Sequence, residues 1–100
     1  MTNYQLGFDL RGATRQQYRR ITRAIVSMGD AVRATQSQWL LSSTLSESEV
    51  RRRLVMHVGR GRVMVSTLGD CIAHSGMSPD VVRWLERHGY MPGSDLDLAA

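Results

Sequence analysis

The chain has 100 residues with 13 basic and 9 acidic side chains, and every basic residue is an arginine. A chain of this length forms one domain with a modest core. It has no apolar run long enough for a membrane span and no basic start followed by an apolar stretch, so we expect a cytoplasmic protein without a secretory signal. Its one cysteine, Cys71, excludes an intrachain disulfide and offers no metal-site spacing.

The formal net charge of +4 is unevenly distributed. Residues 1–62 hold eleven arginines against four acidic residues, whereas residues 63–100 hold two arginines against five acidic residues. Because the guanidinium group presents a planar fork that suits phosphate, an arginine-rich body favours a polyanionic partner. The alternative is that a chain without lysine uses arginine for solubility.

The first predicted element is a strand over residues 4–10, where large apolar side chains alternate with small or polar ones. We expect Tyr4, Leu6 and Phe8 to point into a core. The strand therefore ends on a lone carboxylate, Asp9, on its less apolar face. Asp9 is the main candidate for chemistry.

A helix is predicted from the N-cap Thr14 to a stop at Gly29. Its buried stripe has helical spacing and consists of Tyr18, Ile21, Ile25 and Met28. A second, exposed stripe is the clearest basic patch of the sequence and consists of Arg15, Arg19 and Arg23, with Arg20 further round. It is either a nucleic-acid contact or an ordinary solvated helix face.

Residues 30–35 and 38–43 are predicted to form an antiparallel hairpin, because only two residues separate the strands. Its Trp39 is expected to fill the core or an interface. A capping box of Ser46 and Glu49 then opens a second helix. Its buried face holds Val50, Leu54 and Val58, and its outer face holds Arg51, Arg52 and Arg53.

The second helix ends near Gly59, and the loop Arg60–Arg62 leads into a strand over residues 63–68. We interpret this loop first as a turn, and second as a phosphate contact without helix-dipole support. A short edge strand is expected over residues 71–74. Ser78 and Pro79 open a last helix, whose buried side is expected to hold Val81, Val82, Leu85 and His88 with Trp84 near its edge.

The order strand, helix, strand, strand, helix, strand predicts an α+β, ferredoxin-like βαββαβ fold with an antiparallel sheet and an extra C-terminal helix. Residues 1–90 are expected to form the single domain. Residues 91–100 are expected to form an acidic, disordered tail. Asp70, near the end of the last core strand, is the other acid at a strand end.

The ordered motifs resemble a family, the small CRISPR-associated Cas-two proteins and their stand-alone, non-CRISPR relatives, with the virulence-associated protein D group more distant. The strand end Phe8-Asp9-Leu10 resembles the family's Tyr-Asp-Leu, and residues 36–40 resemble the hairpin of the stand-alone relatives. The match covers roughly residues 3–68. Phe8 stands where the family has Tyr, and the C-terminal helix lies outside the match.

The resemblance implies a homodimer in which Asp9 of each chain faces its symmetry mate. There the two carboxylates would share a divalent metal such as Mg²⁺ for phosphodiester cleavage, which would make the protein a metal-dependent endonuclease. The resemblance equally implies a non-catalytic scaffold or nucleic-acid-binding protein, since many members cut little or nothing.

For the binding function, the expected DNA or RNA backbone contacts are the nine arginines Arg15, Arg19, Arg20, Arg23, Arg51, Arg52, Arg53, Arg60 and Arg62. The alternative is a protein-interaction module, for instance an accessory protein of a phage or mobile element or one half of a toxin–antitoxin pair. In that case the open sheet face and Trp39 or Trp84 would bind a protein partner.

Overall fold

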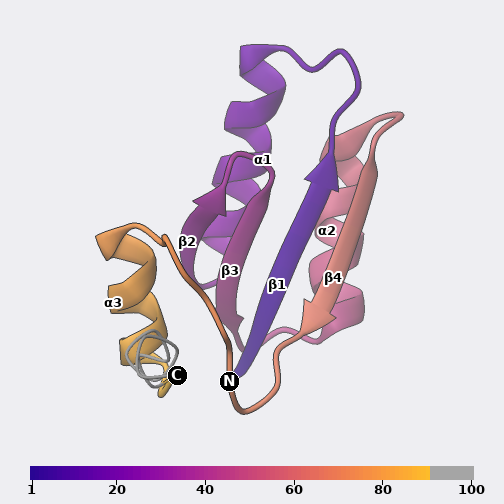
Figure 1. The fold of residues 1–100 in the computed structure, drawn as a ribbon. Coiled ribbons are helices and arrows are strands. Elements are labelled where there is room, and N and C mark those ends of the chain that lie inside the picture. The colour runs from indigo at the N-terminus through magenta and orange to yellow at the C-terminus, as the bar shows by residue number, and fades with distance from the viewer. Residues whose placement is uncertain (91–100) are drawn as a thin grey trace.

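The computed structural model describes residues 1–90, so the expected tail at 91–100 lies outside the described residues. Its elements follow the predicted order (Figure 1). They are β1 (Thr2–Asp9), α1 (Arg15–Ser27), β2 (Asp30–Thr35), β3 (Gln38–Ser43), α2 (Glu47–Val58), β4 (Arg62–Thr67) and α3 (Pro79–Arg87). Within residues 1–90, none of these helices has the length and apolarity needed to cross a bilayer.

The four strands form one antiparallel sheet in the order β2-β3-β1-β4. β1 is therefore central, and Leu6 stands opposite Trp39 of β3 on one side and opposite Val65 of β4 on the other. The predicted α+β, ferredoxin-like fold with an added C-terminal helix is confirmed.

The sheet carries a separate apolar cluster on each face. The larger cluster joins alternate residues of the strands to α1 and α2, which lie together behind the sheet in Figure 1. Tyr4, Leu6 and Phe8 belong to it as predicted, and all three are buried. The smaller cluster lies on the opposite face and joins Leu40 of β3 to α3.

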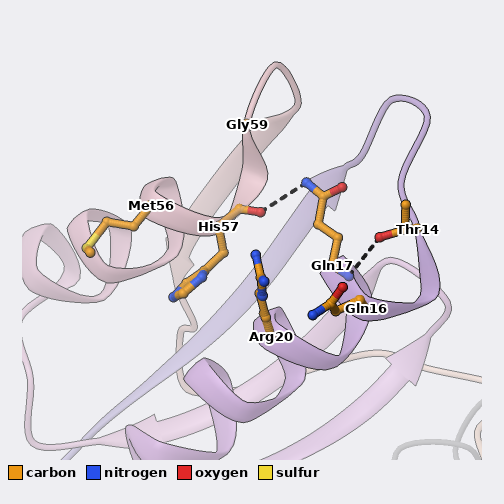
Figure 2. A pocket seen from close by; sticks show the side chains of 7 residues that line it. All are labelled: Thr14, Gln16, Gln17, Arg20, Met56, His57 and Gly59. Carbon is orange, nitrogen blue, oxygen red and sulfur yellow. Dashed lines mark hydrogen bonds between the residues drawn. The ribbon is translucent and has the colours of Figure 1, made fainter.

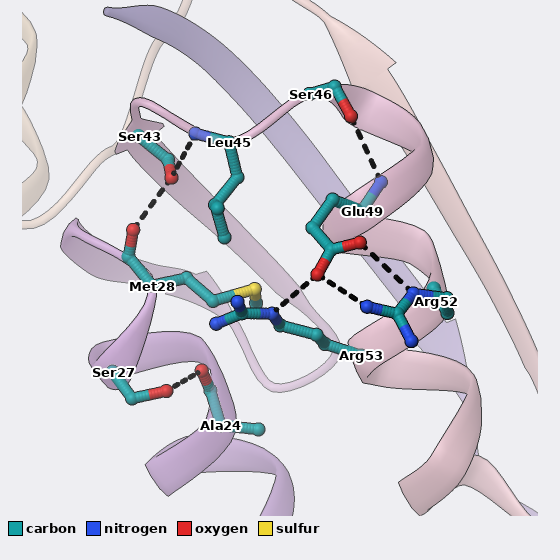
Figure 3. A network of polar contacts seen from close by, with 9 residues as sticks. All are labelled: Ala24, Ser27, Met28, Ser43, Leu45, Ser46, Glu49, Arg52 and Arg53. Carbon is teal, nitrogen blue, oxygen red and sulfur yellow. Dashed lines mark hydrogen bonds and ion pairs between the residues drawn. The ribbon is translucent and has the colours of Figure 1, made fainter.

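Both predicted N-caps of the two core helices are present. The Thr14 hydroxyl accepts a hydrogen bond from the amide of Gln17, and the Ser46 hydroxyl accepts one from the amide of Glu49. The capping box is only half formed, because the Glu49 carboxylate accepts from Arg52 and Arg53, with no bond to the Ser46 amide among the described contacts (Figure 3).

The connection from α1 into β2 requires glycine for reasons of space. A Cβ at Gly29 would collide with the backbone carbonyl oxygen of Ser42 in β3. Close by, the Ser43 hydroxyl donates to the Met28 carbonyl over 2.6 Å and accepts from the Leu45 amide over 3.1 Å (Figure 3). Ser43 thereby ties the end of α1 to the segment that enters α2.

The C-terminal helix differs from its prediction in two respects. Trp84 is fully buried at the centre of the contact between α3 and the sheet, so its predicted place near the edge is wrong. Residues 71–74 do not form a strand. Ile72 lies in an irregular segment and packs against the apolar cluster of α3. This packing explains why position 72 is apolar although it is not hydrogen-bonded in the sheet.

Asp30, the first residue of β2, fastens α3 to the sheet. Its carboxylate accepts two hydrogen bonds from Arg87, at 3.0 and 3.2 Å, and its Oδ2 lies 2.6 Å from Nε2 of His88. Its backbone carbonyl accepts from the Trp84 indole nitrogen at 3.0 Å. Hydrogen bonding from Arg87, and then from His88, holds the pKa of Asp30 below its usual value.

This pKa shift predicts a pH-dependent attachment of α3. A carboxylate with a depressed pKa in the folded state stabilises that state above its unfolded pKa, and the contribution is lost as pH falls through the folded value. We expect Asp30→Asn to lower the free energy of unfolding by up to about 1 kcal/mol at neutral pH, allowing for solvent screening of a half-exposed group. The difference should shrink as the pH falls below the ordinary Asp pKa of about 3.9, and it should be lost once the pH is below the depressed folded pKa.

Urea titrations followed by tryptophan fluorescence measure this difference, since Trp84 of α3 is buried against the sheet. The matched control is Asp80→Asn, which removes an exposed carboxylate paired with Arg83 within α3 itself. Equal stability of Asp30→Asn and the parent at neutral pH would contradict the attachment role.

Candidate functional site

Asp9 is the last residue of β1 and is exposed. Since Tyr4, Leu6 and Phe8 face α1 and α2, the alternation of the strand directs Asp9 to the opposite face of the sheet. Its partner in the ladder is Arg62, the first residue of β4. Opposite charges therefore stand directly across the two strands, at a separation beyond ion-pair contact.

Close backbone packing fixes this cross-strand arrangement. A Cβ at Gly61 would overlap the carbonyl oxygen of Asp9, so only glycine allows the loop before β4 to approach the end of β1 this closely. The Gly61 amide also donates to the Val58 carbonyl at 2.7 Å, which joins the end of α2 to the same point. The backbone of Asp9 is thus packed directly against the loop that precedes β4.

Asp70 does not join Asp9. It follows β4, and the preceding Leu68 amide donates to the Asn3 carbonyl, at the other end of β1. Since β1 and β4 run antiparallel with Asp9 opposite Arg62, the two acids lie at opposite ends of the sheet, roughly 20 Å apart along the strands. Within residues 1–90, no three potential metal-ligating side chains gather.

A single chain therefore does not fit a Mg²⁺ site at Asp9. Magnesium in proteins is bound by one or two carboxylates together with other oxygen ligands. Here one carboxylate faces an arginine across the ladder, and the second strand-end acid is remote. A shared site would require a second copy to bring its own Asp9.

The arginine stripe of α1 occupies the predicted exposed face. Arg15, Arg19 and Arg23 are exposed, and so is Arg20 further round the helix. The first turn of the helix contains no acidic residue. None of the four arginines forms an ion pair with an acid among residues 1–90. The opposite side of the helix is buried through Ile21 and Ile25.

The arginines of α2 behave differently from one another. Glu49 accepts from Arg52 at 2.6 Å and from Arg53 at 3.2 Å, and these bonds lower the pKa of Glu49 (Figure 3). Arg51 is exposed and forms no such pair within the described part of the chain. Two of the three predicted phosphate contacts on α2 thus already have a carboxylate partner.

The end of the sheet that carries Asp9 is basic. Its ladder partner Arg62 is exposed, and so is Arg60 in the preceding loop. The Phe8 amide donates to the Ser37 carbonyl at 3.0 Å, which brings the turn between β2 and β3 to the same end. There the Arg33 guanidinium is held across the turn by two backbone carbonyls.

Sequence reasoning missed Arg11 and Arg33 as members of this basic end. The predicted strand order could have located them, because in an antiparallel sheet of this order the end of β1, the β2–β3 turn and the start of β4 all lie at the same end of the sheet. The opposite end carries three acids, which are Asp30 at the start of β2, Glu47 at the start of α2 and Asp70 after β4, although Asp30 is paired with Arg87 and His88.

No family model matches the sequence, and the search of curated proteins gives no match. Solved structures do match. One is a hypothetical protein of Thermus thermophilus, at 17% identity with a TM-score of 0.60, covering 78% of this chain and 94% of that one. Another is Streptococcus pyogenes Cas2, a Cas-two protein, at 20% identity with a TM-score of 0.53, covering 67% of this chain and 86% of that one. The chain therefore has a Cas2-like fold.

Proposed function

We propose that this protein binds the phosphate backbone of DNA or RNA without cutting it. The observation that carries the proposal is the exposed arginine stripe of α1, which has no ion-pair partner among residues 1–90. Arginine without a carboxylate partner is free to pair with phosphate oxygens in a bidentate fashion. The basic end of the sheet extends the same charge beyond the helix.

Such contacts position a nucleic acid but do not identify its bases. Reading single-stranded bases commonly uses exposed aromatic rings as stacking platforms. Trp39 is 8% exposed and belongs to the core behind the sheet, and Trp84 of α3 is fully buried against the other face of the sheet. We therefore propose backbone binding with little sequence preference.

The burial of both tryptophans also counts against a protein-interaction module that binds its partner through Trp39 or Trp84. That hypothesis used an open sheet face with Trp39 or Trp84 available to a partner. Trp39 points to the helix side, and Trp84 fills the other face from within the same chain. A partner would have to use other side chains.

We further propose that two copies associate through the part of the outer sheet face that α3 leaves open. The α3 helix packs on β2 and Leu40 of β3, and Met64 of β4 remains 70% exposed on that face. Met64 stands opposite Gly7 in an open strip along β1 and β4, where the polar pairs Gln5–Ser66 and Asp9–Arg62 flank it. Asp9 lies on the same face, at its end.

Binding of fluorescently labelled random-sequence DNA and RNA tests the backbone proposal. We expect affinity to fall steeply with salt, because each phosphate contact contributes a log–log slope of about −0.9 on duplex and −0.7 on single strands. The triple variant Arg15→Gln, Arg19→Gln, Arg23→Gln should reduce the slope by about 2 to 3 on duplex. Arg83→Gln, on α3, is the matched control. Salt-independent binding, or an unchanged slope in the triple variant, would contradict the proposal.

A second measurement decides between binding and catalysis. Labelled DNA and RNA are incubated with Mg²⁺ or Mn²⁺ and with the parent protein or Asp9→Ala. We expect no cleavage by either protein, since Arg62 stands opposite Asp9 in each copy and its positive charge would repel a metal ion held there. Metal-dependent cutting that is lost in Asp9→Ala would instead establish a nuclease in which two chains share the metal.

The proposed association is tested by light scattering after gel filtration. Met64→Arg places a charge at the centre of the exposed strip without disturbing a buried side chain. We expect a dimeric parent and a monomeric variant, whereas Met56→Arg on α2, an equally exposed methionine on the helical side, should leave the dimer intact. A monomeric parent, or a Met64→Arg protein that stays dimeric, would contradict this interface.

A further inference from the structure

A groove separates the start of α1 from the end of α2. Its volume is about 290 Å³. Figure 2 shows the side chains that line it, which are Thr14, Gln16, Gln17, Arg20, Met56 and His57, together with Gly59. Most of these are hydrogen-bonding residues, so the groove favours a polar ligand over an apolar one.

Two hydrogen bonds through Gln17 hold the walls of the groove together. The Gln17 amide nitrogen donates to the Thr14 hydroxyl at 3.1 Å, and its side-chain nitrogen Nε2 donates to the His57 carbonyl at 3.1 Å (Figure 2). Gln17 therefore spans the two helices. Gln16, Arg20 and His57 also line the groove, and their side chains make no hydrogen bond among the contacts of residues 1–90.

The groove contains the positive charge of Arg20 and no acidic side chain. In Figure 2 the Arg20 guanidinium lies between the His57 ring and the Gln16 amide. No carboxylate lines the groove, and Arg20 makes no ion pair with an acid of residues 1–90. Glu49, the acid that pairs with the α2 arginines, is near the other end of that helix.

We infer that this groove binds one phosphoryl group. A planar guanidinium suits two phosphate oxygens, and an imidazole and an amide can donate to the others. Arg20 lies further round α1 than Arg15, Arg19 and Arg23 and lines the groove together with residues of α2, so a phosphate held here would lie next to the arginine stripe. As a contact of a nucleic-acid backbone, the assignment rests on the proposed function; as a phosphoryl site, it stands on the groove itself.

Nuclear magnetic resonance titration with inorganic phosphate tests the groove directly. Shift changes are expected at Gln16, Arg20 and His57 in the parent protein. Arg20→Gln and His57→Gln should each weaken the apparent affinity about tenfold, the effect of losing one charge-assisted hydrogen bond. Arg83→Gln makes the same charge change on α3 and should leave the affinity unchanged. Dispersed spectra confirm that each variant is folded.

A short oligothymidylate distinguishes the two sources of the phosphoryl group. Competition between the oligonucleotide and inorganic phosphate at these three residues supports a backbone contact. Phosphate shifts in a protein that binds no oligonucleotide would support the groove as a site for free phosphate compounds and would reject the proposed function instead. Absence of phosphate shifts at the groove, or unchanged affinity in Arg20→Gln, would overturn the inference even if DNA binds elsewhere.

Discussion

Leu40 and Leu41 are neighbours in β3 and point to opposite faces of the sheet, yet both are buried. A strand that is apolar on both faces must be covered on both, as in sheets with helices on either side. Leu41 is covered by α1 and α2. Leu40 requires a further element, and α3 supplies it with Val81, Trp84 and Leu85. The extra helix is thus an integral part of this fold.

The two-sided burial also determines where charge can be placed. The inner sides of α1 and α2 are used for the core, so their arginines lie on the outer surface. On the opposite face, α3 covers β2 and β3 but leaves β1 and β4 open beside Met64 and Asp9. The arginine stripe of α1 and the open strip along β1 and β4 therefore lie on opposite sides of the sheet. A nucleic acid bound at the arginine stripe of α1 would therefore not compete with a second copy of the chain on the open strip.

The sequence predicted the strand–helix order and the hairpin boundaries because its signals were local. Alternation fixed the core face of β1, and a two-residue turn fixed β2 and β3. The wrong predictions concern side chains with more than one possible partner, because a local sequence pattern does not show which partner is preferred. Glu49 could cap the helix or pair with Arg52 and Arg53, and it does the latter. Helical spacing predicted Trp84 near the edge of the buried side of its helix, whereas its hydrogen bond to the Asp30 carbonyl and its full burial make it the centre of α3 packing.

Similarity of fold carries less information about Asp9 than its immediate neighbours do. A sheet of this topology brings the end of β1 beside the start of β4 in any sequence, so the position alone does not establish chemistry. In this chain the residue opposite is Arg62, and the loop before it adds Arg60. A divalent cation at Asp9 would experience repulsion from both guanidinium groups, whereas a phosphate would be attracted by them. The same electrostatics that weaken a one-chain metal site at this end of the sheet favour the approach of a nucleic-acid backbone.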